Sequence, residues 1–278
     1  MPEGRETADG LVRYHRRAGV AHLVLARPDR ANAVDLPTAR ALGAAVDRAT
    51  ADPEVRAVLV RGEGRRFCAG GDVEAMAAAP DRAAYLRELA NTLDGALRRL
   101  ADMPKPVVVA VQGAAAGAGL ALVLSCDVAV VATSAKFLTA YAGVGLTPDC
   151  GLSHLLPRAV GQPRALELAL TGRTLTAAEA LAWGMISEVA DDARLEDRAR
   201  HLAEVLAAGP AFALGQTKRL VRRSAETSRE EAGREETRVI ASAVTEPESA
   251  ALLAAFTVRG PSRSGRSAVG GHASGPGD

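Results

Sequence analysis

Short apolar runs and helical stripes alternate along residues 11–191. The apolar runs predict strands at residues 11–17, 21–25, 57–60, 106–111 and 127–132. Apolar positions at helical spacing predict helices at residues 37–51, 74–78, 82–101 and 117–124. Strands that alternate with helices in this way are typical of an α/β fold.

The pattern changes after residue 191. Residues 192–258 indicate consecutive helices with no strand between them, and Ser228 with Glu231 forms the spacing of a capping box. Residues 259–278 are rich in Gly, Ser and Pro, which predicts a disordered tail. The sequence therefore predicts an α/β core at 11–191, a helical region at 192–258 and a tail at 259–278.

Charge and cysteine content exclude several classes of protein. A net charge of +1 favours neither nucleic acid nor an anionic membrane as the main partner. Cys68, Cys126 and Cys150 form no CxxC pair, which indicates free thiols and a cytoplasmic location. The longest apolar run, 120–132, is too short and too interrupted for a membrane span. No His, Asp or Glu spacing predicts a metal site.

Two glycine-rich segments, 66–73 and 111–120, each follow a predicted strand and precede a predicted helix. Main-chain N–H groups at the start of a helix lack partners within the helix, and the helix dipole favours negative charge there. Two such loops that face each other could hold one developing oxyanion. Taken singly, each loop is better explained as a tight structural connection of an α/β protein than as a functional site.

The order of these and other motifs resembles the crotonase (enoyl-CoA hydratase/isomerase) superfamily over residues 11–258. The matching motifs are Leu25-Ala26-Arg27-Pro28, Asn32-Ala33, Phe67-Cys68-Ala69-Gly70-Gly71-Asp72, Pro104-Lys105-Pro106, Val111-Gln112-Gly113, Cys126-Asp127, Gly145-Leu146-Thr147-Pro148-Asp149, Leu156-Pro157-Arg158, Thr171-Gly172-Arg173 and Trp183-Gly184. The resemblance implies a spiral of β-β-α units followed by helices that assemble a homotrimer or a hexamer of two trimers. It also implies an acyl-CoA thioester as substrate, with no separate cofactor because CoA is part of that substrate.

The resemblance assigns the binding residues. The main-chain N–H groups of Ala69 and Ala118 match the pair that holds the thioester carbonyl. Lys218 resembles a lysine that meets a CoA phosphate, although a solvated helix charge is an equal alternative. The stretch that resembles the main-chain CoA contacts comprises Ala69, Gly70, Gly71, Asp72 and Val73.

The acid/base residues decide the reaction. Hydratases of this superfamily use two glutamates, and the matching positions here are Ala121 and Tyr141. Asp149 resembles the catalytic aspartate of several isomerases, where one carboxylate moves a proton between two carbons. Asp149 could instead cap the helix that begins near Leu152. Tyr141 either hydrogen-bonds the substrate or lines the pocket.

Three hypotheses follow from these residues. The first is an enoyl-CoA isomerase that shifts a C=C bond with Asp149 as acid and base. The second is an atypical hydratase or another enolate reaction, such as a ring-modifying step. The third, from a different class, is a non-catalytic acyl-CoA-binding scaffold.

Overall fold

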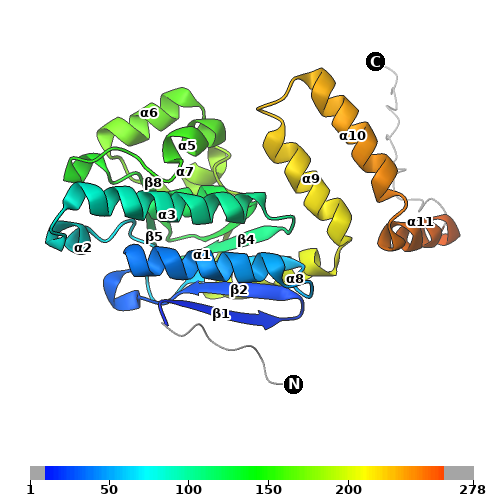
Figure 1. Ribbon diagram of the computed structural model, residues 1–278, viewed down its shortest axis with the longest axis horizontal. Helices are drawn as coiled ribbons and strands as arrows, with labels where there is room; N and C mark the ends of the chain where they lie inside the picture. The colour runs from blue at the N-terminus through cyan, green and yellow to red at the C-terminus, as the bar shows by residue number, and fades with distance from the viewer. Residues whose placement is uncertain (1–9, 260–278) are drawn as a thin grey trace, which may run out of the picture. The chain divides into compact units, whose positions relative to one another are not determined.

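The computed structural model describes residues 10–259, which form two β-sheets and the helices around them (Figure 1). The strands are β1 (Val12–Arg17), β2 (Val20–Leu25), β3 (Ala57–Gly62), β4 (Val107–Val111), β5 (Ala114–Ala116), β6 (Val128–Ala132), β7 (Lys136–Leu138), β8 (Leu175–Thr176) and β9 (Glu188–Ala190). The helices are α1 (Leu36–Ala51), α2 (Val73–Ala78), α3 (Arg82–Asp102), α4 (Ala118–Ser125), α5 (Leu152–Val160), α6 (Gln162–Thr171), α7 (Ala177–Ala182), α8 (Leu195–Ala208), α9 (Ala211–Arg223), α10 (Arg229–Ala243) and α11 (Pro247–Arg259), with short 3-10 turns η1 (Pro28–Arg30), η2 (Ala142–Val144) and η3 (Asp192–Arg194).

The strand order shows the predicted spiral. The main sheet has the order β1-β2-β3-β4-β6-β9, and the smaller sheet has the order β5-β7-β8. All neighbours in the main sheet are parallel except β1 and β2. The chain places β4 in the main sheet and β5 in the smaller one, forms α4, and then repeats the step with β6 and β7. This repetition confirms the α/β fold built from β-β-α units.

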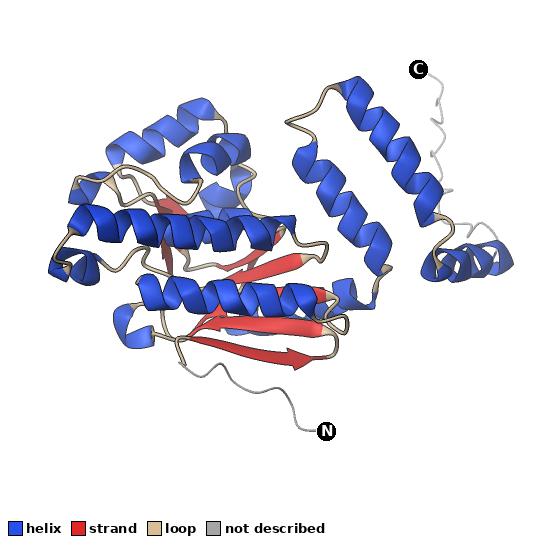
Figure 2. Cartoon of the chain, in the orientation of Figure 1, coloured by secondary structure: helices blue, strands red, loops and turns tan. Residues whose placement is uncertain are grey.

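Helices cover both faces of the main sheet. Strands β2 and β4 are buried along their whole length, as expected for a parallel sheet that is covered on both sides. Helix α1 packs against β1 and β2 and lies beside α3, whereas α8 packs against β3, β4 and β6 (Figure 2). The core therefore consists mainly of Ala, Val and Leu side chains.

The longer predicted elements agree with the structure to within one or two residues at most ends. The predicted helix at 82–101, for example, is α3 at Arg82–Asp102. Strands β5, β7, β8 and β9 have two or three residues each and were not predicted. A strand this short contains no measurable alternation of apolar and polar positions, so sequence periodicity does not detect it.

The described chain divides into two compact units, one up to Ser228 and one from Arg229 onwards. This division lies later than the predicted boundary at 191/192. The reason is that α8 buries Leu195, Ala199 and Ala203, which recur every four residues along the helix, in the core of the first unit. The predicted tail, 259–278, lies outside the described residues apart from its first residue.

The second unit contains α10 and α11, and the large apolar side chains exposed in it are Ile240, Val244, Leu252, Leu253 and Phe256. No single helix within residues 10–259 is long and apolar enough to cross a membrane. Helix α10 and residues 247–257 are together long and apolar enough for a membrane span, but the two segments are bent by 79° relative to each other.

The two histidines of the β1–β2 hairpin predict an acid-sensitive stability. The rings of His15 and His22 stack with centroids 4.4 Å apart, and His22 is buried. Burial lowers the pKa of His22 from 6.5 to about 4, and the nearby His15 and Arg61 act in the same direction. Above pH 6.5 the imidazole is neutral in both states. As the pH falls from 6.5 towards 4, the unfolded chain takes up this proton first, so the free energy of unfolding decreases.

We therefore expect His22→Gln to lose less stability than the natural protein between pH 7 and pH 5. Urea unfolding of both proteins at the two pH values measures the difference. An equal loss in both proteins would contradict a contribution from His22.

Candidate active site

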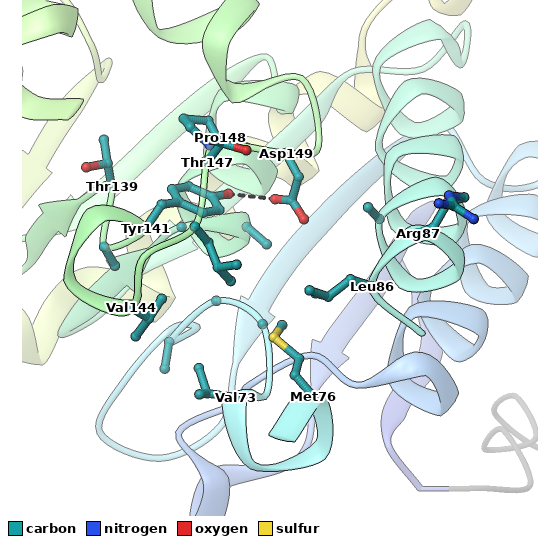
Figure 3. Close-up of a pocket in the computed structure, with 18 residues that line it drawn as sticks. Val73, Met76, Leu86, Arg87, Thr139, Tyr141, Val144, Thr147, Pro148 and Asp149 are labelled. Atoms are coloured by element: carbon teal, nitrogen blue, oxygen red, sulfur yellow. Dashed lines mark hydrogen bonds between the residues drawn. The ribbon is translucent and has the colours of Figure 1, made fainter. Parts of the chain in front are cut away.

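A mostly apolar cavity of about 470 Å³ opens beside the two glycine-rich loops (Figure 3). Its size suits a small-molecule ligand. Among the described residues that line it, Asp149 is the only carboxylate. The lining residues are Ala69, Gly70, Gly71, Val73, Met76, Leu86, Arg87, Ala90, Gly117, Ala118, Thr139, Ala140, Tyr141, Val144, Leu146, Thr147, Pro148 and Asp149.

The structure corrects the first of the two predicted main-chain donors. The N–H of Ala69 donates to the carbonyl of Ala31 over 3.0 Å, so it is not available to a ligand. The N–H of Gly70 hydrogen-bonds the Cys68 sulfur. Neither group can therefore stabilise a ligand oxyanion without losing its internal partner.

The free donor of this loop belongs to Gly71. Val34 donates its N–H to Gly70 O (2.8 Å) and accepts at its carbonyl from Asp72 N (2.9 Å), which forms a parallel bridge around Gly71. In such a bridge the intervening residue directs its own N–H to the opposite side. Gly71 lines the cavity, and its N–H has no acceptor within residues 10–259. The sequence predicted only a general CoA contact for Gly71.

The second predicted donor, Ala118, lies where the sequence placed it. Ala118 is the first residue of α4 and lines the cavity, so its N–H has no partner within the helix. A Cβ atom on Gly70 would lie 3.6 Å from Ala118 N and 2.9 Å from Ala116 O. The two loops are therefore in contact, and Gly70, with φ of +95°, has to be glycine.

Tyr141 and Asp149 form a hydrogen-bonded pair at the cavity wall (Figure 3). The Tyr141 hydroxyl donates to Asp149 Oδ1 over 2.7 Å. Burial, followed by the charge of Asp149, raises the pKa of Tyr141, so the hydroxyl keeps its proton and remains a donor. A Cβ atom on Gly117 would lie 3.7 Å from Tyr141 Oη, so the pair lies beside the loop that carries Ala118.

Asp149 does not act as a helix cap through its side chain. The residue before α5 is Gly151, and no side chain caps that helix. The main-chain carbonyl of Asp149 accepts from Leu152 N, which leaves the carboxylate free of this turn. The capping alternative for Asp149 is therefore wrong.

Two residues predicted to bind CoA have internal partners. The Asp72 carboxylate accepts from Ala75 N (3.1 Å) and pairs with Arg27 (3.1 Å). The main chain of Asp72 is engaged as well, because its N–H donates to Val34 O (2.9 Å) and its carbonyl accepts from Met76 N (3.0 Å). The Lys218 ammonium lies 3.0 Å from Lys105 O and 2.9 Å from Asp127 Oδ2, and only 7% of the side chain is exposed. Lys218 does not line the cavity, and the alternative of a solvated helix charge is wrong because the side chain is buried.

The remaining chemistry of the region is limited. Ala121 is fully buried inside α4, and the two cysteines near the loops are buried as well. Burial raises the pKa of Cys68 to about 11, and burial together with the charge of Asp149 raises that of Cys150. Both remain thiols at neutral pH and so are poor nucleophiles. The described residues contain no group of three His, Cys, Asp or Glu side chains that could hold a metal.

Comparison with known proteins agrees with this arrangement. The Enoyl-CoA hydratase/isomerase family matches residues 15–261. The 1,2-epoxyphenylacetyl-CoA isomerase of Escherichia coli (strain K12) is 43% identical over 77% of this chain and 82% of the relative. The 4-chlorobenzoyl coenzyme A dehalogenase-2 of an Arthrobacter species is 34% identical over 90% and 91%.

A solved structure from Mycobacterium abscessus, described as an enoyl-CoA hydratase/isomerase, superposes with a TM-score of 0.85 at 37% identity. The match covers 89% of this chain and 96% of that one. Sequence and fold thus agree over nearly the whole described chain. On this evidence, the chain belongs to the enoyl-CoA hydratase/isomerase (crotonase) family and is an enzyme of that family.

Proposed function

We propose that this enzyme shifts the C=C bond of an enoyl-CoA, with Asp149 as the group that moves the proton. The observation that carries the proposal is the position of Asp149 as the one carboxylate among the described lining residues of an otherwise apolar cavity. The relative from Escherichia coli is named an isomerase, which supports the same class of reaction.

The proposed reaction starts from a 3-enoyl thioester whose carbonyl oxygen accepts hydrogen bonds from Gly71 N–H and Ala118 N–H. The Asp149 carboxylate removes a proton from carbon 2, and the electron pair moves into a dienolate whose oxygen carries the charge. The Asp149 carboxylic acid then returns the same proton to carbon 4. The product is a 2-enoyl thioester, and the carboxylate is regenerated.

Tyr141 supports this role through its hydrogen bond. The hydroxyl holds one oxygen of the Asp149 carboxylate, and the apolar cavity wall limits the water that could compete for the proton. Tyr141 stands where the family's hydratases have their second glutamate, and Ala121 stands where they have the first. An ordinary hydratase mechanism, which uses both carboxylates, is therefore disfavoured.

A ring-modifying enolate reaction is the second candidate. It is favoured by the name of the Escherichia coli relative, which acts on an epoxide of phenylacetyl-CoA. Both candidates use the same two N–H donors and one carboxylate, so the acyl group decides between them. The third hypothesis, a non-catalytic acyl-CoA scaffold, is disfavoured because the family and the relatives that match this chain are enzymes.

Incubation with a 3-enoyl-CoA in deuterated water tests the proposal. We expect a 2-enoyl-CoA product in which the proton from carbon 2 is found mainly at carbon 4. Deuterium enters only where the Asp149 carboxylic acid exchanges with solvent before it returns the proton. Incorporation of water oxygen would instead indicate hydration. Tight binding of the thioester with neither a 2-enoyl-CoA product nor exchange at carbon 2 would contradict the proposed isomerase reaction.

We also propose that the protein assembles as a homotrimer or as a hexamer of two trimers. The exposed apolar side chains of α10 and α11, such as Ile240 and Phe256, are 70% and 71% exposed in the single chain and favour burial in an interface. The mass in solution by light scattering would measure the assembly. The cytoplasmic location stays a prediction.

A further inference from the structure

Asn32 is a buried side chain that the proposed chemistry does not use. It lies between β2 and α1, is 1% exposed and has φ of +55°, a left-handed conformation that asparagine adopts more readily than most residues. Its Oδ1 accepts from Arg27 N over 2.9 Å. Its Nδ2 donates to Glu63 O over 2.9 Å and to Arg66 O over 2.8 Å. One amide therefore joins the segment after β2 to the start of the first glycine-rich loop and the residues just before it.

The residues around Asn32 hold that loop directly. Four hydrogen bonds connect residues 31–34 with residues 68–72, and they occur on both sides of Gly71. These bonds are Ala69 N to Ala31 O (3.0 Å), Cys68 Sγ to Asn32 O (3.2 Å), Val34 N to Gly70 O (2.8 Å) and Asp72 N to Val34 O (2.9 Å).

The direction of the Gly71 N–H follows from this connection. The four bonds occupy the neighbouring groups and leave the Gly71 N–H directed away from residues 31–34, at the wall of the cavity. The side chain of Asn32 is closely packed, because a Cβ atom on Gly62 would lie 2.8 Å from Asn32 Nδ2 and 2.5 Å from Phe67 O. A change at the Asn32 amide would therefore be transmitted to the loop and not absorbed by empty space.

We propose that Asn32 is a positioning residue that aims the Gly71 N–H at the thioester carbonyl, without touching the substrate itself. This inference rests on the proposed function of the cavity. A hydrogen bond to the carbonyl strengthens as negative charge develops on its oxygen, so a small error in the direction of the donor affects the transition state more than the bound substrate. Asn32 is thus expected to influence kcat more than binding.

Asn32→Asp tests the inference with the smallest change of shape. The variant keeps an acceptor for Arg27 N but places an oxygen against the carbonyls of Glu63 and Arg66. We expect kcat for isomerisation to fall by about 100-fold, as when an oxyanion donor is lost. We expect the Kd for a 2-enoyl-CoA to stay within about threefold of the natural value, because uniform binding is retained.

The decisive readout is the infrared stretching frequency of a ¹³C-labelled thioester carbonyl in the bound 2-enoyl-CoA. In the natural protein the two donors should lower this frequency relative to free thioester, and in Asn32→Asp it should return part of the way. A role in stability alone would leave the frequency of the folded variant unchanged. Asn91→Asp, at an exposed position of α3, makes the same chemical change and should leave frequency and kcat at natural values.

Cys68→Ala serves if Asn32→Asp does not fold, because it keeps the Asn32 amide and removes the bonds of the Cys68 sulfur to Asn32 O and Gly70 N. We expect a smaller return of the carbonyl frequency and a smaller loss of kcat in this variant. If folded Asn32→Asp showed the same carbonyl stretching frequency as the natural protein, the inference would be overturned. The same holds for Cys68→Ala if Asn32→Asp does not fold. No frequency shift in the natural protein would instead overturn the proposed function of the cavity, and the inference with it.

Discussion

Asp149→Asn should lower kcat for isomerisation of a 3-enoyl-CoA by about 10³-fold, because general acid–base catalysis by one group contributes 10²–10⁴-fold. The amide has nearly the shape of the carboxylate and can still accept from the Tyr141 hydroxyl, so the cavity should keep its form. It cannot remove a proton from carbon 2. Steady-state kinetics with the 3-enoyl-CoA, followed by product analysis, measures the loss.

Two controls separate chemistry from folding in this experiment. The Kd of Asp149→Asn for a 2-enoyl-CoA should remain close to the natural value, since the proposed donors to the carbonyl, Gly71 N–H and Ala118 N–H, are unchanged. Tyr141→Phe keeps the carboxylate and removes only the 2.7 Å hydrogen bond, so its loss of kcat should be smaller than that of Asp149→Asn. If Asp149→Asn isomerised its substrate at the natural rate, Asp149 could not be the proton carrier.

Asp127→Ala should lower the free energy of unfolding by about 3–5 kcal/mol, more than any other substitution proposed here. The Asp127 carboxylate lies 2.9 Å from Lys218 Nζ, 2.7 Å from Arg222 Nη2 and 2.8 Å from Val107 N. Burial of Lys218 already lowers the pKa of its ammonium, with Asp127 opposing that change. Removing the carboxylate leaves this buried positive charge without its counter-charge, and urea unfolding at pH 7 measures the cost.

Asp197→Ala is the matched control for this substitution. Asp197 pairs with Arg200 over 2.6 Å, but 74% of its side chain is exposed, so water replaces the lost partner. We expect no measurable loss of stability in this variant. A similar small effect of Asp127→Ala would mean that the carboxylate does not anchor α9 through Lys218 and Arg222.

Elements with a strong local signal were predictable from the sequence. Helix α3 presents Leu89, Leu93, Leu97 and Leu100 on one face, and this stripe predicts both its length and its buried side. Strand β4 is a continuous apolar run that ends at a glycine-rich turn. The division between compact units was not predictable in the same way, since α8 and α10 look equally helical and differ in what they pack against.

The position of Lys218 shows a second limit. A lysine on an amphipathic helix with arginine neighbours is typical of a solvated surface. In the structure its ammonium reaches Lys105 O and Asp127, from segments more than 90 residues away in the chain. Burial of this kind depends on which strand end packs against the helix, and the local sequence around residue 218 does not predict that contact.

The family and the chemical content of the site could be predicted from the sequence, because ordered motifs and single residue identities suffice for both. The sequence showed that Asp149 is present and that Ala121 and Tyr141 stand at the glutamate positions. Which N–H groups are free, and what holds the carboxylate, depends on contacts that exist only in the folded chain. Ala69 and Gly71 are near-equivalent in the sequence, but Ala31 accepts from the first, whereas the bridge at Val34 leaves the second unpaired. Availability of a main-chain donor depends on its spatial partner, which residue type does not encode.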